Sequence, residues 1–348
     1  MVGYKDYVNR FLLECRDSLR EQTYPKELYE VYIVDNASIN DCEFIKANYP
    51  EAIAIPTDHG NYCTANNIGL KSAMENGCEY FIIANMDTKF SPDWISELVK
   101  AMESDPKIGI AQSKMLLYPK TEEEWKQPKI NSLGNIMHFL GFGFTSAYNE
   151  LDREITGYPE ITGYASGCSY ITNKEVLDKI GLYDEDYHMY HDDIEMSWRV
   201  KLAGYKIVLA PKSVMYHKYE FRRSILMLYF MERNRYLVMF QYYKLPTLIL
   251  LAPAIIAMEC GMIFFSIASG WFGKKVEEIK YFFSPKVWAK IIAKRKEIRK
   301  FRVVKERDII KSFEGRVLFQ EIQNPVLKYI ANPIFNLYWQ VVKRVIFW

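Results

Sequence analysis

The chain reads YFIIANMDT at residues 80–88. Apolar and β-branched residues, which favour a buried strand, run directly into two side chains with ligand oxygens, Asn85 and Asp87. Open α/β sheets bind ligands at the carboxyl ends of their strands. The stretch therefore predicts a strand of an α/β domain with a ligand site at its end.

The same rhythm extends on both sides of this stretch. Further strand candidates are residues 30–34, 52–56, 109–115, 168–172 and 206–210, and helical patterns between them cover residues 4–22, 64–76, 92–104, 174–180 and 194–203. Such alternation is typical of an α/β domain. Residues 118–163 break it with polar, glycine-containing and aromatic stretches. This segment is too long for a simple connection, so we expect a binding or lid region.

Two strand ends carry candidate ligand-binding groups. Asp35, in YIVDNAS at residues 32–38, can accept hydrogen bonds from a nucleobase or a ribose, or it can simply cap a turn. Asn85 and Asp87 lie two positions apart and could share one Mg²⁺ or Mn²⁺ that bridges a diphosphate. The alternative for this pair is a capped turn before the next helix.

An acidic cluster is the most specific signal. Asp192, Asp193 and Glu195 enter an amphipathic helix beside two histidines, in YHMYHDDIEMSWR at residues 187–199. Acids at a helix start can be a plain cap, because the helix dipole favours them there. The like charges also suit a carboxylate held as a general base. His217 is a lone histidine that would be a metal ligand if the fold brings it to Asp87.

Composition excludes some classes and divides the chain. Of 348 residues, 49% are hydrophobic and 25% charged, as in a globular protein, and a net charge of +2 argues against nucleic-acid binding. Residues 274–311 nevertheless hold 14 basic and 5 acidic side chains. They follow an apolar run, residues 248–269, whose only charge is Glu259. We expect this run to be membrane-inserted, re-entrant or interfacial, with a buried core helix as the alternative.

The cysteines and the first residues point to the cytoplasm. Six cysteines show neither a C-x-x-C pair nor zinc-ligand spacing, so they fit a reducing compartment. Residues 1–13 carry Lys5, Asp6 and Arg10 instead of the apolar run of a signal peptide. The expected location is a membrane-associated protein with its catalytic domain in the cytoplasm.

The order of these motifs resembles glycosyltransferase family 2, and within it the rhamnosyltransferase-like members. Matching stretches include YIVDNAS, ANNIGL, ANMDT, ITGYASGCSYI, GLYDEDYHMYHDDIEMSWRVKLAGYKI and VMYHK. The resemblance implies a GT-A fold, a Rossmann-like mixed sheet with flanking helices, over residues 1–219. Residues 220–348 would form a helical, membrane-associated region. The implied activity is a metal-dependent, inverting glycosyl transfer from a nucleotide sugar to a glycan acceptor. The implied partners are a lipid-linked sugar and the membrane surface.

The resemblance also assigns roles by position. Asp193 would be the catalytic base, with Asp192 before it, and Asp87 and His217 would hold Mg²⁺ or Mn²⁺. The donor site would use Asp35 at the nucleobase together with Asn36, Asn66, Asn85, Gly163 and Gly167.

Two departures from the family pattern stand out. Residues 59–62 read HGNY where members often have Asn-x-Gly-Phe, which affects the donor pocket. Members also begin with an apolar central strand that would end before Tyr4. Either the true start lies upstream or the protein works without this strand, so we expect the first strand to be lacking from this chain. The competing hypothesis is therefore a catalytically impaired, membrane-tethered relative that acts as a binding or scaffold protein.

Overall fold

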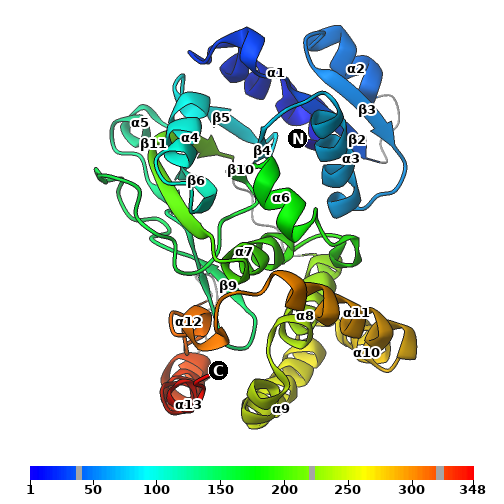
Figure 1. Cartoon of the computed structure of the whole chain (residues 1–348). Helices are drawn as coiled ribbons and strands as arrows, with labels where there is room; N and C mark the ends of the chain where they lie inside the picture. The colour runs from blue at the N-terminus through cyan, green and yellow to red at the C-terminus, as the bar shows by residue number, and fades with distance from the viewer. Residues whose placement is uncertain (37–40, 219–223, 319–324) are drawn as a thin grey trace. The chain divides into compact units, whose positions relative to one another are not determined.

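A computed structural model describes residues 1–36, 41–218, 224–318 and 325–348 (Figure 1). The chain divides into two compact units. Unit 1 comprises residues 1–135, 145–200 and 205–220, and unit 2 comprises residues 136–144, 201–204 and 221–348. Two short segments that precede residue 220 in the sequence thus belong to the second unit.

Unit 1 contains a mixed sheet. Its strands follow the order β4-β10-β6-β11-β5, with β7 paired to β6. β10 is antiparallel to β4 and to β6, whereas β11 is parallel to β6 and antiparallel to β5. The bounds are β4 Tyr80–Ala84, β5 Thr88–Phe90, β6 Ile108–Leu117, β7 Ile130–Ser132, β10 Ser169–Asn173 and β11 Lys206–His217. The expected α/β class with a mixed sheet is confirmed.

Helices flank the sheets of unit 1 (Figure 1). They are α1 Tyr7–Arg20, α2 Asp41–Asn48, α3 Tyr62–Glu75, α4 Trp94–Glu103, α5 Glu122–Lys126, α6 Lys174–Ile180 and α7 Asp192–Leu202, with 3-10 turns at Lys26–Leu28 and Glu185–Tyr187. Asn61 caps α3 by accepting from the Thr64 amide, as an N-cap asparagine should. Trp94 of α4 stacks on Phe90 and donates its indole N–H to Ser113, so this helix is fixed to the sheet.

A second, parallel sheet has the order β1-β2-β3, with bounds Val2–Tyr4, Tyr32–Asn36 and Ile53–Thr57. The strand that we expected to be lacking is therefore present as three residues, in register Val2 to Val34. A cavity of about 650 Å³ lies between β2 and β4, lined by Met1 and by residues of both strands. The Met1 ammonium donates to the Tyr32 carbonyl there (2.8 Å), and burial lowers its pKa to about 6.

Unit 2 is helical apart from a hairpin, β8 Asn135–Met137 and β9 Gly143–Thr145, that the chain enters from unit 1. Its helices are α8 Ile225–Tyr242, α9 Leu245–Ala268, α10 Phe272–Phe282, α11 Pro285–Phe301, α12 Glu306–Ile310 and α13 Asn332–Val345, with a π-helical turn at Leu327–Ala331. Phe139 stacks on Trp339 with ring centroids 4.9 Å apart, which joins the hairpin loop to α13. The expected helical C-terminal region is confirmed.

Candidate active site

The ends of β4 and β11 bring an acid and an imidazole together. Asp87 lies in the turn between β4 and β5, and β5 pairs with β11 so that Thr88 is opposite His217. As a result the His217 Nε2 atom lies 3.3 Å from the Asp87 Oδ2 atom. The two residues are 130 positions apart in the sequence, and the sheet register makes them neighbours.

This pair is buried, and each member favours the charge of the other. Burial raises the pKa of Asp87, but hydrogen bonding to His217 and its charge outweigh burial, so the pKa lies below its ordinary value. Burial lowers the pKa of His217, but Cys168 and Asp87 raise it well above 6.5. Each side chain therefore stabilises the charged form of the other, and Nε2 of His217 must lose its proton before it can bind a cation.

Asn131 of β7 orients the imidazole. Its Oδ1 atom lies 3.0 Å from the His217 Nδ1 atom, and an amide oxygen can only accept. Nδ1 therefore carries a proton, which leaves Nε2 as the nitrogen that faces Asp87. A partner on the far nitrogen is the usual way in which proteins orient a metal-binding histidine. Sequence reasoning missed Asn131, because nothing in the run INS at residues 130–132 marks it.

The Asp87–His217 pair suits a divalent cation. The Asp87 Oδ1 atom is buried and has no hydrogen-bond partner among the described residues, so this oxygen fits a cation ligand. Asn85, two residues away, uses its Oδ1 to accept from the Tyr62 hydroxyl (3.3 Å). No cluster of three or more His, Cys, Asp or Glu side chains with metal-site geometry occurs in the described part of the chain. A cation here would need further ligands from a bound substrate or from water.

A second group of acids lies at the start of α7. The Asp193 Oδ2 atom accepts from the Gly167 amide (3.3 Å), and its Oδ1 atom accepts from the Ile194 amide (2.8 Å). Asp192 is buried beside it. Among the described residues, no cation forms an ion pair with either carboxylate, which distinguishes this pair from an ordinary buried acid.

Burial raises the pKa of both acids. The pKa of Asp192 rises to about 8, because burial and then the Asp193 charge disfavour its ionised form. The pKa of Asp193 rises to about 6, because burial outweighs the amides of Gly167 and Ile194 that stabilise its charge. The two carboxyl groups therefore titrate as a pair above the ordinary range of aspartate, and a carboxylate of such a pair is able to accept a proton near neutral pH.

The backbone before α7 is strained. His188, Tyr190 and His191 have positive φ angles of 65°, 64° and 60°, which non-glycine residues rarely adopt. The His188 carbonyl accepts from the amides of Tyr62 and Cys63 (2.9 and 3.2 Å), so this turn is tied to the start of α3. Strain of this kind, about 1 to 3 kcal/mol per residue, is found most often at functional sites. It could not be read from the sequence.

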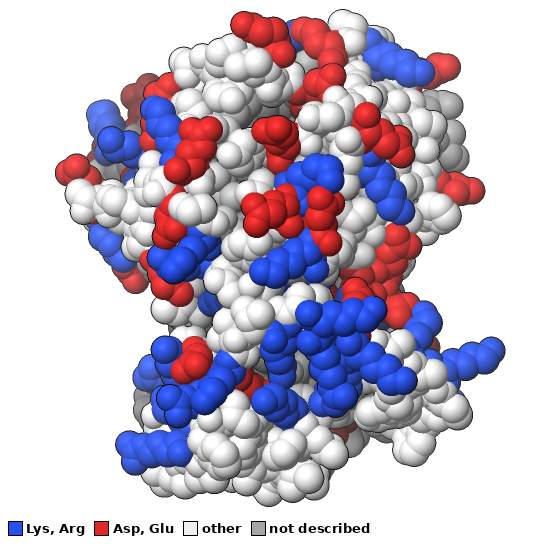
Figure 2. All heavy atoms as spheres, viewed as in Figure 1, with Lys and Arg blue, Asp and Glu red and all other residues white. Residues whose placement is uncertain are grey.

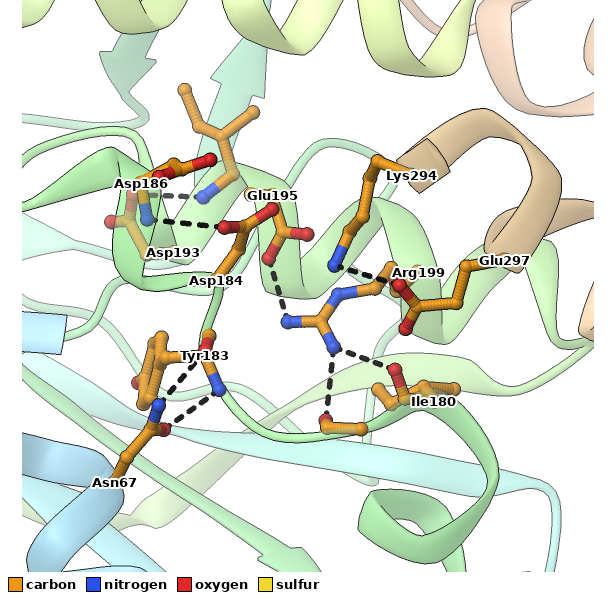
Figure 3. Close-up of polar contacts among 12 residues, drawn as sticks. Asn67, Ile180, Tyr183, Asp184, Asp186, Asp193, Glu195, Arg199, Lys294 and Glu297 are labelled. Atoms are coloured by element: carbon orange, nitrogen blue, oxygen red, sulfur yellow. Dashed lines mark hydrogen bonds and ion pairs between the residues drawn. The ribbon is translucent and has the colours of Figure 1, made fainter. Parts of the chain in front are cut away.

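Glu195, the third acid of the cluster, is structural. Its Oε2 atom lies 2.6 Å from the Arg199 Nη2 atom, and both side chains are fully buried. Arg199 also donates to the carbonyls of Ile180 and Gly181 (2.6 and 2.9 Å), as Figure 3 shows. In the same view, Asn67 of α3 holds the Tyr183 backbone through both of its amide atoms. The acidic cluster thus separates into a paired structural acid and an unpaired acidic couple.

Two consecutive residues, Gly167 and Cys168, connect the Asp192–Asp193 couple to the Asp87–His217 pair. The Gly167 backbone N–H donates to Asp193. The Cys168 carbonyl accepts from the backbone N–H of Asn85 (3.0 Å), and the Cys168 side chain raises the pKa of His217. Tyr62 lies nearby as well, since the Asp192 charge adds to the effect of burial in raising its pKa. Residues from β4, β10, β11 and α7 therefore form one site. Cys168 and Tyr62, which the sequence analysis did not single out, belong to it.

The remaining predicted donor-site residues lie around this centre in different ways. Asp35 and Asn36 are buried at the end of β2, and the residues that follow, 37–40, lie outside the described part. Asn66 donates to the Tyr62 carbonyl (3.0 Å) and lines the cavity between β2 and β4. Beside Gly163, Tyr164 pairs its backbone with Asn135, which anchors that end of the loop. Their roles stay predictions.

Comparison with known proteins points to one family. Residues 6–181 match the model of a family described as glycosyl transferase family 2. The O-antigen biosynthesis protein RfbC of Myxococcus xanthus is 27% identical over 230 residues, which are 62% of this chain and 17% of that protein. An N-acetylglucosaminyl-diphospho-decaprenol L-rhamnosyltransferase of Mycobacterium tuberculosis is 26% identical over 210 residues, 54% of this chain and 66% of the relative.

A solved structure supports the fold. The crystal structure of GalNAc-T7 with UDP, GalNAc and Mn²⁺ superposes with a TM-score of 0.51 at 16% identity, covering 67% of this chain and 46% of that one. At this identity the likeness concerns the fold alone. The chain spans about a sixth of the first curated relative and about two thirds of the second.

Proposed function

Because the chain belongs to glycosyl transferase family 2, whose model matches residues 6–181, we propose that it is an inverting transferase that moves a sugar from a nucleotide-sugar donor to a hydroxyl of a glycan acceptor. The observation that carries the proposal is the unpaired acidic couple at the start of α7, joined through Gly167 and Cys168 to the Asp87–His217 pair. This displacement needs a base for the acceptor hydroxyl and a group that binds the diphosphate of the donor, and both must lie within one site.

Asp193 acts as the base in this proposal. Its carboxylate takes the proton of the acceptor hydroxyl while the hydroxyl oxygen forms a bond to the anomeric carbon, and the bond from that carbon to the diphosphate oxygen breaks. One displacement inverts the anomeric configuration. Burial raises the pKa of Asp193 to about 6, which suits a base near neutral pH, and Asp192 lies buried beside it.

Asp87 and His217 would hold a Mg²⁺ or Mn²⁺ ion, which would neutralise the charge that develops on the leaving diphosphate. The buried, unpartnered Oδ1 atom of Asp87 supports this assignment, as does Asn131, which turns Nε2 of His217 toward Asp87. Asn85 would then serve the donor through its side chain. Asp35 and Asn36 would contact the nucleobase or ribose from the end of β2, with Asn66, Gly163 and Gly167 completing the donor site.

The proposed acceptor is a lipid-linked sugar at the cytoplasmic face of a membrane, in the assembly of a cell-surface polysaccharide. The names of the two curated relatives, an O-antigen biosynthesis protein and a decaprenol-linked rhamnosyltransferase, support this class. One helix of the described chain, α9 Leu245–Ala268, is long and apolar enough to cross a membrane, which is consistent with membrane association.

The test uses purified full-length protein, a panel of UDP-, dTDP- and GDP-sugars, Mn²⁺, and the extracted lipids of a polysaccharide-producing bacterium. Transfer of labelled sugar into the lipid fraction, abolished by excess chelator, is the expected result. A protein that binds nucleotides but neither hydrolyses nor transfers any sugar in the panel would favour the impaired relative.

A further inference from the structure

Helix α9 has two different faces. Thr247, Leu251, Ala254, Met258 and Ser266 are buried and lie on one side of the helix. The other side is exposed and apolar, and we call Ile249, Ile256, Phe264 and Ile267 the α9 stripe; Phe264 is 73% exposed. Spacings of seven, eight and three residues keep these side chains on one face. Of the most apolar 18-residue window of α9, only 17% is buried, so α9 is not a core helix of unit 2.

Helix α13 repeats this arrangement. Ile334, Leu337, Val341 and Val345 are exposed at helical spacing and form the α13 stripe, whereas Trp339 and Val342 are buried on the other side. The Tyr338 hydroxyl donates to the Leu250 carbonyl, and the Trp348 indole donates to the Thr247 hydroxyl (3.0 Å). The two helices are therefore neighbours, and Figure 2 shows uncharged surface where they lie in unit 2.

The inner side of α9 is joined to buried charges. Lys275 of α10 is fully buried and contacts Glu259 of α9 (2.8 Å), Glu278 (2.6 Å) and Glu232 of α8 (3.7 Å). Glu232 also pairs with Arg235 (2.7 Å), and the Tyr236 hydroxyl donates to Glu259 (2.6 Å). A spanning α9 would take this cluster, with its side chains from α8 and α10, into hydrocarbon, where charged side chains are costly. The geometry opposes a transmembrane orientation.

Basic side chains accompany the apolar surface. Helix α11 exposes Lys286, Lys290, Lys296, Arg299 and Lys300, together with the aromatic Trp288. Figure 2 shows Lys and Arg gathered in a band over unit 2 where α11 and α12 lie, next to the uncharged surface of α9 and α13. Apolar residues that enter a lipid layer, with cations beside them at headgroup level, are the pattern of an interfacial anchor.

We propose that unit 2 is a monotopic anchor: α9 and α13 lie in the plane of an anionic phospholipid bilayer, with the two stripes in the outer acyl region and the basic residues of α11 at the phosphates. The inference deepens the proposed function, on which it rests for the membrane-bound acceptor. It assigns the surface that brings the protein to that acceptor, and it excludes a spanning helix.

Vesicle flotation of the full-length protein tests the surface. Vesicles of phosphatidylcholine with 30% phosphatidylglycerol should bind the protein, and pure phosphatidylcholine or 0.5 M NaCl should weaken binding, because salt screens the basic residues. Two double variants introduce charge into the stripes. One carries Ile256→Asp and Phe264→Asp in the α9 stripe, and the other carries Leu337→Asp and Val341→Asp in the α13 stripe. Each should lower the partition coefficient by about tenfold or more. Leu28→Asp, at an exposed apolar residue of unit 1, is the matched control and should bind as the wild type does.

Depth measurements test the orientation. Cys42 and Cys78 would first be replaced by serine, so that the exposed Cys260 can be labelled with a fluorophore. Two further variants would add Cys260→Ser and carry the fluorophore on Ile249→Cys or on Phe264→Cys. Quenching by lipids with nitroxides at different depths should place all three sites at one shallow level. Residues 249 and 264 are about 22 Å apart along a helix axis, so a spanning helix would place them at clearly different depths.

The outcomes separate this inference from the proposed function. Nucleotide release from donor sugars with water as acceptor, measured without lipid, should be equal in the wild type and in the stripe variants. Activity without vesicle binding would overturn the anchor but support the transferase. Vesicle binding without activity would overturn the transferase but support the anchor. Sedimentation of a stable dimer that the stripe substitutions dissociate, with no vesicle binding, would show that a second copy covers the face and would also overturn the anchor.

Discussion

Both units contain acids removed from solvent, but these acids differ in whether a cation pairs with them. In unit 2, Glu232, Glu259 and Glu278 surround Lys275, and Arg235 supplies a second cation. In unit 1, Asp192 and Asp193 are adjacent and have no ion pair to a cation among the described residues. Burial raises the pKa of acids in both units, including Glu278 to about 7. In unit 2, however, the cations hold the acids in ion pairs that join helices, whereas the acidic couple of unit 1 remains available to a substrate proton. The contrast separates structural acids from candidate catalytic ones within one chain.

The largest effect should come from removing the cation of unit 2. Lys275→Met leaves three acids around one remaining arginine, so the free energy of unfolding of this unit should fall by about 3 to 5 kcal/mol. Hydrogen exchange of α9 and α10 amides, followed by mass spectrometry, measures the loss.

Its neighbour is the control. Lys274→Met breaks an exposed pair with Glu277 and should cost no more than about 0.5 kcal/mol. Equal protection of the α10 amides in the two variants would show that the cluster does not fasten the helices.

In unit 1 the corresponding change should affect catalysis and leave the fold intact. Asp193→Asn should lower turnover by about 100-fold or more while donor affinity stays nearly normal, because an amide cannot accept the proton. Steady-state nucleotide release gives the rate, and calorimetry gives the affinity. Asp178→Asn, at an exposed acid of α6, is the control and should change neither. Near-normal turnover in Asp193→Asn would remove this residue from the base role.

The Asp87–His217 pair should control metal-dependent binding. Asp87→Ala and His217→Ala should each weaken donor binding in Mn²⁺ by about tenfold or more, and Asn131→Ala should have a similar but smaller effect through the imidazole. Titration with nucleotide in Mn²⁺ and in chelator measures the metal-dependent part. Asp93→Ala, at an exposed acid before α4, serves as control. Identical affinities with and without chelator would contradict the metal assignment.

The smallest effect concerns stability. The folded pKa of Asp192, about 8, lies above its ordinary value, so the wild type loses stability as pH rises from about 4 to 8. Asp192→Asn lacks this titration. Its free energy of unfolding should equal that of the wild type near pH 4 and exceed it at pH 8, and the difference should grow with pH between these values. Denaturant unfolding at the two pH values checks this, and a difference that shrinks with pH would refute the buried-acid account.

Local patterns predicted much of the fold and part of the site. Strand β4 with Asp87, the acidic start of α7, and the apolar α9 follow from hydrophobic runs and their ends, which are local properties. The meeting of Asp87 with His217 depends on the register between β5 and β11, which no local pattern contains. The resemblance to a family supplied that expectation instead.

Other features could not be predicted because they depend on packing. Glu195 looks like Asp192 and Asp193 in the sequence, and only its burial against Arg199 makes it structural. Asn131 and Cys168 become important through neighbours that are distant in the chain. The short β1 was expected to be lacking, since three residues are too few to show a strand pattern, yet they pair with β2.

The most direct test of the central claim, a single displacement assisted by Asp193, is the anomeric configuration of the first product. Proton NMR during hydrolysis of an accepted nucleotide sugar, with water as acceptor, resolves that configuration before the free sugar equilibrates. If the displacement is single, the first sugar released has the configuration opposite to that of the donor, and Asp193→Asn suppresses its formation. A first product with the donor's own configuration would contradict a single displacement.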